Sequence, residues 1–185
     1  GNLSLTNTDN FLTGNADFTI SIWARLSDSN KKDPRKILFA TDTINGFQLS
    51  LAKWTKGKPV PEFYIGGRLV FGVALGTDVL AMPLDYWHHF ILTRENGTFS
   101  LLLNDKPTAE GKTNLPINGK GFFFGGKERK REGEKNLHSW TGGLDDIRIY
   151  RRALSGPELS ALHELEKPLD ADGDALTNWD GVYIH

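Results

Sequence analysis

The chain has 185 residues, which fits one domain that buries about 70% of its unfolded surface. Its 22 basic and 23 acidic residues leave a net charge of −1, so no strong field attracts nucleic-acid phosphates or anionic lipid, and we expect neither partner. The absence of cysteine excludes disulfides, thiolate zinc sites and thiol catalysis, and no apolar run reaches the length of a membrane span.

Short alternating segments account for most of the chain as far as residue 150. The polar opening with Leu3 and Leu5 favours an edge strand, and the turn that follows it contains Asp9. Phe18–Leu26 alternates apolar with partly polar residues, which is typical of a strand with one buried face. We predict further strands over residues 36–40, 47–54, 63–65, 69–75, 86–93, 98–103, 122–124 and 144–150.

Turn and loop signals separate these strands. Asn96-Gly97 lies between two alternating runs and predicts a tight hairpin. Residues 107–120 are polar and interrupted by proline and glycine, so we predict a loop there. Residues 127–135 mix both signs of charge and predict a solvated loop rather than a nucleic-acid patch. Many short strands with turns between them indicate an all-β sandwich.

A short helix is predicted after the last strand. Ser155 and Glu158 have the spacing of a capping box, and Pro157 is tolerated in the first helical turn. We expect the helix to end near Lys167-Pro168, because the residue before a proline avoids the helical region. Its apolar positions form one packing stripe: Leu159, Leu162 and Leu165.

Asp145 is the first residue that suggests chemistry. In the predicted strand over 144–150 it shares its parity with Ile147 and Ile149, so a core-facing isoleucine pair would turn this carboxylate inward. A buried carboxylate is costly unless it finds donors, a cationic side chain or a metal ion. The residues alone leave open whether backbone amides or a metal satisfy it.

Three segments together resemble the laminin-G-like, concanavalin A-like jelly rolls. Residues 142–159, from Gly-Gly-Leu-Asp-Asp-Ile-Arg-Ile-Tyr to Glu-Leu, are similar to the closing signature of that family. Residues 17–25 resemble its early core strand, and residues 87–106 resemble its central hairpin. The resemblance spans residues 1–166 and implies a two-sheet antiparallel jelly-roll sandwich with a short C-terminal helix. Residues 167–185 would then be an acidic tail or linker.

The resemblance also implies a structural calcium ion, the one cofactor that we expect. Related glucanases and lectins often hold calcium at the aspartate equivalent to Asp145, and Asp9 is a candidate co-ligand because calcium prefers hard oxygen ligands. The tail resembles the Asp-x-Asp-Gly-Asp calcium repeats of bacterial extracellular proteins, although Ala175 and Gly181 depart from an EF-hand. Its candidate ligands are Asp170, Asp172, Asp174 and Asn178.

Sugar binding requires an aromatic platform beside polar side chains. Trp54 is the best candidate for the platform, with Gln48 on its own parity and Tyr64 able to lie alongside. In the alternative interpretation Trp54 caps the edge of the sandwich, since aromatic side chains bury large areas. The tryptophans in the three family-like segments are expected in the core: Trp23, Trp87 and Trp140.

Catalytic and metal-binding patterns are otherwise missing. His88 and His89 are neighbours in a predicted strand, so they face opposite sides and cannot share one ion. Glycosidases require two nearby carboxylates, and the glucanases of this fold carry them on one strand as Glu-x-Asp. No glutamate of this chain has an aspartate two positions later, and Asp145 and Asp146 are expected on opposite faces. We therefore expect no enzyme.

The sequence thus predicts a non-catalytic carbohydrate-binding or adhesion module of an extracellular bacterial protein. We expect a secreted or cell-surface location, with the export signal upstream because no signal peptide is visible, and a monomeric module within a larger chain. Its expected partner is a polysaccharide or other glycan, and a cell-surface protein is the second candidate. Two alternatives stay open, a structural or protein-interaction module without sugar binding and a glycan-cleaving domain whose acids converge in space.

Overall fold

The computed structural model describes residues 3–5, 12–27, 35–41, 46–55, 58–72, 82–118, 121–126 and 139–166. The chain divides into two compact units, residues 1–154 and residues 155–185. The predicted boundary between residues 166 and 167 stays a prediction, because the tail lies outside the described residues.

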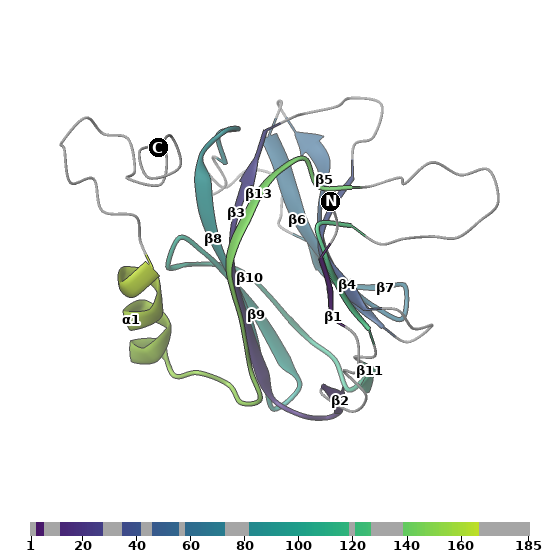
Figure 1. The fold of residues 1–185 in the computed structure, drawn as a ribbon. Helices are drawn as coiled ribbons and strands as arrows, with labels where there is room; N and C mark the ends of the chain where they lie inside the picture. The colour runs from purple at the N-terminus through teal and green to yellow at the C-terminus, as the bar shows by residue number, and fades with distance from the viewer. Residues whose placement is uncertain are drawn as a thin grey trace. The chain divides into compact units, whose positions relative to one another are not determined.

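Two large antiparallel sheets make up the first unit (Figure 1). The six-stranded sheet has the order β1-β12-β4-β5-β6-β7. Its strands are β1 Leu3–Leu5, β12 Phe122–Phe124, β4 Lys36–Thr41, β5 Phe47–Thr55, β6 Lys58–Ile65 and β7 Arg68–Gly72.

The five-stranded sheet has the order β10-β9-β8-β3-β13. Its strands are β10 Lys106–Lys112, β9 Thr98–Leu103, β8 Trp87–Glu95, β3 Phe18–Leu26 and β13 Gly142–Tyr150. A two-stranded pair joins β2, Thr13–Gly14, to β11, Ile117–Asn118. The predicted two-sheet antiparallel jelly-roll sandwich is confirmed.

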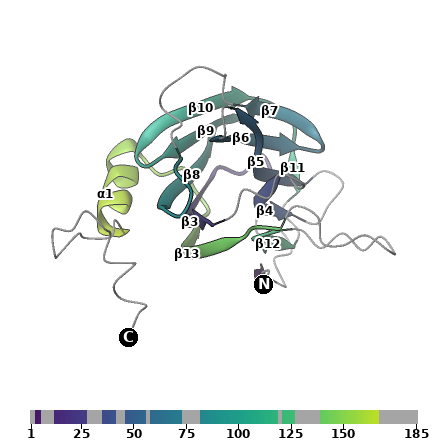
Figure 2. The same ribbon diagram turned by 90° about the horizontal axis from the view of Figure 1, so that it is seen from above.

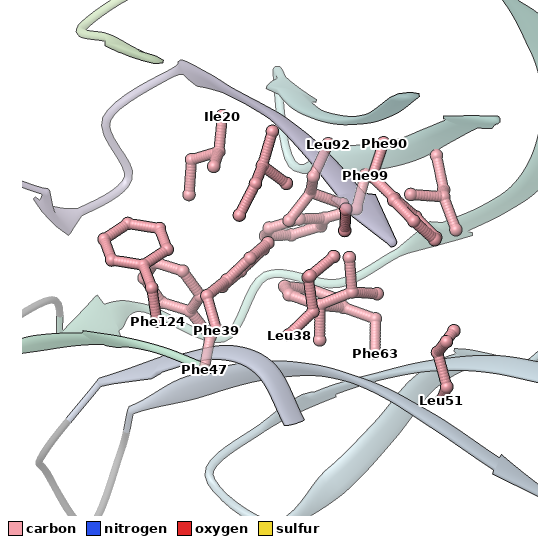
Figure 3. Packing of buried hydrophobic residues seen from close by; sticks show 14 of the residues in the cluster. Ile20, Leu38, Phe39, Phe47, Leu51, Phe63, Phe90, Leu92, Phe99 and Phe124 are labelled. Atoms are coloured by element: carbon pink, nitrogen blue, oxygen red, sulfur yellow. The ribbon is translucent and has the colours of Figure 1, made fainter. Parts of the chain in front are cut away.

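The hydrophobic core lies between the two large sheets (Figure 3). Phe18 of β3 and Phe47 of β5 stack with ring centroids 5.6 Å apart, so this pair joins one sheet to the other. Phe47 also contacts Phe122 of β12, at 5.6 Å between centroids, and Phe63 of β6, at 6.1 Å. Each such side chain, once buried, contributes about 1.5–3 kcal/mol of hydrophobic free energy. The alternation read from the sequence is the pattern that places these rings inside.

The sheets come closest where β7 faces β10 (Figure 2). A Cβ atom added to Gly111 of β10 would lie 2.5 Å from the carbonyl oxygen of Val70 and 3.0 Å from its Cγ1. Residue 111 therefore has no room for a side chain, and this glycine permits the close approach of the two edge strands.

Trp140 connects the two sheets by hydrogen bonds. Its backbone N–H donates to the carbonyl of Gly125, which follows β12, at 2.9 Å. Its indole Nε1–H donates to the carbonyl of Arg25 in β3, at 3.0 Å. Trp140 packs against the core as expected. Trp23 is buried as expected, although its neighbours Ile22 and Ala24 face the core between the sheets and place Trp23 on the outer face of the five-stranded sheet. Trp87 pairs with Arg25, which shares the parity of Trp23, and is only half-buried.

The predicted hairpin at Asn96-Gly97 is confirmed, since both residues have positive φ, 49° and 78°. The predicted loop over 107–120 was wrong at residues 107–112, which belong to β10, and at Ile117–Asn118, which form β11. The edge strand β10 carries lysines, a proline and a glycine and is mostly exposed, so it lacks the alternation that identifies a strand. Likewise β6 begins at Lys58, and the prediction missed its residues before Phe63 because two prolines interrupt them.

The described part of the second unit is the helix α1, Gly156–Glu166. The Ser155 N–H donates to Glu158 Oε2 at 2.8 Å, as a capping box requires, and the Ser155 hydroxyl donates to the same oxygen. The helix ends just before Lys167-Pro168, as predicted. Leu159 and Leu162 are buried, but Leu165 is 75% exposed, so the predicted leucine stripe was wrong at its last position.

Candidate functional site

A group of polar side chains lies on the outer face of the six-stranded sheet. Alternate residues of β5 and β6, such as Leu49 and Phe63, enter the core, so their neighbours face outward. Gln48 pairs with Tyr64 across these strands, and Ser50 pairs with Glu62. These four residues and Arg35, which precedes β4, form a group of five that is called the β5–β6 polar cluster below.

Glu62, Tyr64 and Arg35 are joined by hydrogen bonds. The Tyr64 hydroxyl donates to Glu62 Oε2 at 2.8 Å, and Arg35 Nη2 donates to the same oxygen at 3.3 Å. Arg35 Nη2 also approaches the Tyr64 hydroxyl oxygen at 3.4 Å. The Arg35 guanidinium carbon lies 5.3 Å from the centre of the Tyr64 ring, within the range of a cation–π interaction.

The electrostatics of the cluster follow from the burial of Glu62. Its side chain is 1% exposed, so its charge requires a close partner, and the guanidinium of Arg35 provides one. Burial raises the pKa of the Tyr64 hydroxyl, and its hydrogen bond to Glu62 raises that pKa further. Tyr64 therefore stays protonated and acts as a donor to Glu62.

Only part of the cluster is accessible to a ligand. Gln48 and Tyr64 are half-buried, and the Arg35 side chain is 38% exposed. Leu69 of β7, which pairs with Tyr64, is 51% exposed and extends this surface with an apolar group. Ser50, which pairs with Glu62, is fully buried, and its Oγ has no hydrogen-bond partner in the described part of the chain.

The structure brings together two of the three predicted sugar-binding residues, Gln48 and Tyr64. Trp54 lies in β5, but its side chain is outside the described residues. The register of β5 with β6 shifts between Ala52 and Thr55, so the parity argument that linked Trp54 to Gln48 does not extend to it.

Arg35 and Glu62 are site residues that the sequence pattern did not indicate. Glu62 has the parity of Tyr64 in β6 and would have been found if the predicted strand had continued back through Pro61. Because β7 pairs with β6 only from Glu62 onward, residues 58–61 have one described neighbouring strand, and an edge position tolerates proline. Arg35 follows a run of mostly charged and polar residues in the sequence, where no local pattern distinguishes it.

The expected inward orientation of Asp145 was wrong. Asp145 pairs with Trp23 and Arg148 pairs with Ser21, so β13 has one more residue than β3 over this stretch. This β-bulge contains Asp146, whose φ is 44°. The bulge changes the parity of β13, so that Leu144, Ile147 and Ile149 all pack against the core. Asp145 lies with Trp23 on the outer face.

Asp145 uses its carboxylate locally. Its Oδ1 accepts a hydrogen bond from the Asp146 N–H at 2.9 Å, which is the backbone-amide alternative left open by the sequence. Among the described residues, no three histidine or acidic side chains gather as a metal site would require. Asp9 and the tail candidates Asp170, Asp172, Asp174 and Asn178 lie outside the described residues, so calcium binding at these positions stays a prediction.

His88 and His89 lie on opposite faces of β8, as expected. The His89 ring stacks on Trp23 with centroids 4.7 Å apart and 1° between planes, and its Nε2 lies 2.7 Å from Ser21 Oγ. Ser21 and His89 are both fully buried, so this pair is not accessible to a substrate.

The sequence profile of the concanavalin A-like lectin/glucanase superfamily matches residues 1–160. The chain belongs to this superfamily. Among curated proteins no sequence matches the chain.

Solved structures share the superfamily fold at low sequence identity. The heptameric SAP-like pentraxin of Limulus polyphemus has a TM-score of 0.63 and 16% identity, over 88% of this chain and 75% of the pentraxin chain. Domain 4 of AbnA, a GH43 extracellular arabinanase of Geobacillus stearothermophilus in complex with arabinotriose, has a TM-score of 0.60 and 17% identity, over 88% of this chain and 72% of that one.

A third similar structure is botulinum neurotoxin type C, whose cell entry depends on interaction with two ganglioside molecules. Its TM-score is 0.63 with 18% identity, over 89% of this chain but only 40% of the toxin chain. In the described residues, no helix combines the length and apolarity that crossing a membrane requires.

Proposed function

We propose that this domain is a non-catalytic carbohydrate-binding module of an extracellular protein. The observation that carries the proposal is the partly exposed set of Arg35, Gln48 and Tyr64, which lies on the outer face of the six-stranded sheet beside exposed Leu69. Such a surface combines donors with aromatic and apolar area, as sugar recognition requires. The carbohydrate-binding and ganglioside-binding domains among the similar structures support it.

The test is a glycan array with the purified domain, repeated on Tyr64→Ala and on Tyr86→Ala. Tyr86 is the matched control, because it is an exposed tyrosine, 55% accessible, outside the cluster. We expect binding by the wild type and by Tyr86→Ala, with loss in Tyr64→Ala. Trp54→Ala is included because an aromatic platform at the end of β5 is still predicted. A folded domain that binds no glycan would contradict the proposal.

A glycan-cleaving activity is the weaker alternative, since the superfamily includes glucanases. Glu62 is the carboxylate of the β5–β6 polar cluster, and it is buried and bonded to Tyr64 and Arg35 rather than facing a bound sugar. The non-catalytic proposal predicts that arrayed oligosaccharides stay intact after long incubation, which mass spectrometry of the eluted sugars measures.

The second candidate is a protein-interaction module, and exposed Leu69 beside Tyr64 and Arg35 favours it. Tyrosine and arginine are also the residues enriched at protein-binding hot spots. The test is capture of a cell-surface protein by the domain. Capture that persists after the glycans of that protein are removed enzymatically, and that Leu69→Ser abolishes, would favour this candidate over sugar binding.

A structural calcium ion is part of the proposal. We expect chelation to lower the melting temperature, with Asp145, Asp9 and the acidic tail as candidate ligands. Asp145→Ala also removes the hydrogen bond to Asp146 and can lower the melting temperature for that reason alone. The decisive quantity is therefore the change in melting temperature on adding chelator, compared between Asp145→Ala and the wild type. A melting temperature that chelator leaves unchanged in the wild type would eliminate the metal.

A further inference from the structure

The accessible polar groups of the β5–β6 polar cluster are mostly hydrogen-bond donors. Arg35 uses Nη2 for Glu62 and Tyr64, whereas its Nε and Nη1 make no hydrogen bond in the described part of the chain. Gln48 adds an amide with one donor group and one acceptor. The guanidinium therefore offers three N–H hydrogens on Nε and Nη1 to a ligand that reaches this surface.

The one carboxylate of the cluster is buried and already accepts hydrogen bonds. Glu62 is 1% exposed, and its Oε2 already accepts hydrogen bonds from Tyr64 and Arg35. The Tyr64 hydroxyl gives its hydrogen to Glu62, so it cannot donate to a sugar without breaking that bond. A neutral sugar presents hydroxyl groups that both donate and accept, and it is matched best by a site with accessible carboxylates. This cluster offers none.

The Arg35 guanidinium is also held in place before any ligand arrives. Glu62 anchors one nitrogen, and the Tyr64 ring lies under the guanidinium at 5.3 Å. Binding to a fixed guanidinium costs less side-chain entropy than binding to a free arginine. Its planar array of N–H groups matches the oxygen atoms of a carboxylate or a sulfate.

We propose that the β5–β6 polar cluster selects acidic glycans, with Arg35 Nε and Nη1 donating to a carboxylate or sulfate group of the sugar. This inference rests on the proposed function, because it names the class of glycan that the same site binds. The buried charge of Glu62 fixes Arg35 without competing for the ligand at the surface.

The experiment is isothermal titration calorimetry with two matched pairs of oligosaccharides. Tetragalacturonate is compared with its fully methyl-esterified form, and a sulfated carrageenan tetrasaccharide with its desulfated form. We expect affinity for at least one charged member and about tenfold or greater weakening for its neutral counterpart, with affinity falling as salt rises. The two pairs distinguish carboxylate from sulfate as the source of the acceptor.

Arg35→Met is the decisive variant, and Arg68→Met is its control. Arg68 is an exposed arginine at the start of β7, in the register position next to Leu69, so it tests the effect of losing any nearby positive charge. We expect Arg35→Met to remove about tenfold or more of the affinity for the charged sugar and Arg68→Met to change it little. If Arg35→Met alone unfolds, the double variant with Glu62→Gln removes the buried charge as well and keeps the test available.

Several results would overturn this inference while leaving the proposed function intact. These are equal affinity for charged and neutral members, glycan-array binding confined to neutral sugars, or equal losses in Arg35→Met and Arg68→Met. If poly-glutamate binds as tightly as the charged sugar, non-specific charge attraction rather than glycan recognition would explain the binding. The absence of binding to every glycan on the array would reject the proposed function together with this inference.

Discussion

Asp145 Oδ1 accepts a hydrogen bond from the N–H of Asp146, 2.9 Å away, at the residue where β13 takes a left-handed backbone conformation. The pairing of β13 with β3 is interrupted at this bulge, and the carboxylate satisfies a backbone N–H within the interruption. Asp146 in turn lies 4.0 Å from Arg148, a partly exposed pair that contributes little stability. The local role of Asp145 is therefore to stabilise the β-bulge, and this bulge orients the side chains of Ile147 and Ile149 toward the core.

The first prediction concerns the φ of 44° at Asp146. Asp146→Val places a β-branched residue in the left-handed region and should lower the free energy of unfolding by about 1–2 kcal/mol. Asp146→Gly should be close to neutral, because relief of strain offsets the added chain entropy. Urea unfolding of both variants measures the difference. Equal destabilisation by valine and glycine would show that the bulge conformation is not what matters there.

The second prediction concerns the close approach of β7 and β10. Gly111→Ala inserts a Cβ atom 2.5 Å from the Val70 carbonyl oxygen and should cost about 1–3 kcal/mol, because backbone must move. Gly72→Ala on β7 is the control, since its nearest contacts would be ordinary ones at 3.8–3.9 Å. Thermal melting of the two variants should separate them by several degrees. A Gly111→Ala variant as stable as Gly72→Ala would mean that the sheets separate at little cost.

The third prediction concerns Arg94 of β8, whose side chain is 1% exposed although it carries a charge. Its guanidinium donates to the carbonyl of Ala16 at 2.8 Å, to Asn15 Oδ1 at 3.2 Å and to the carbonyl of Gly14 at 3.5 Å. Arg94→Met keeps an unbranched apolar stem but removes the guanidinium, which leaves these acceptors unpaired.

Arg94→Met should therefore lower the free energy of unfolding by about 1.5–3 kcal/mol, measured by urea unfolding. Arg68→Met, at an exposed position, should change the same quantity by less than about 0.5 kcal/mol. Comparable losses in the two variants would assign the effect to net charge rather than to the hydrogen bonds of Arg94 with residues 14–16.

The fold could be predicted from the sequence because burial and alternation are local properties of each strand. Phe18–Leu26 and Thr98–Leu103 have one apolar face each, and that face is the one in the core. The edge strand β10 could not be predicted in this way, since it is mostly exposed and has no apolar face to detect. The bulge at Asp146 was equally hidden, because one extra residue reverses the parity of every position before it.

The candidate site was predictable only where it followed strand parity. Gln48 and Tyr64 were found because each lies in a clean alternating segment, and the pairing of β5 with β6 sets them opposite one another. Arg35 and Glu62 are 27 positions apart, and their contact depends on how β4, β5 and β6 are ordered in the sheet. Sequence spacing carries no information on such a contact.

The fourth prediction is a loss of stability in acid that originates at His88. This side chain is 5% exposed, and its Nε2–H donates to the carbonyl of Pro83 at 3.1 Å. Its Nδ1 accepts from Asn104 Nδ2 at 3.1 Å, while Asn104 Oδ1 accepts from the His89 N–H at 2.8 Å. Both nitrogens of His88 are thus satisfied in the neutral ring, and a second ring proton would face an amide donor.

Burial lowers the pKa of His88 below its ordinary value of 6.5, so the unfolded chain takes up this proton more readily than the folded one. The contribution of His88 to stability is complete above pH 6.5 and is lost as the pH falls from 6.5 through the lower pKa of the folded state. Urea unfolding between pH 7.5 and pH 5, values chosen to bracket about 6.5, should show this decline. His88→Gln should flatten it, whereas a decline of the same steepness in the variant would assign the acid sensitivity to other groups.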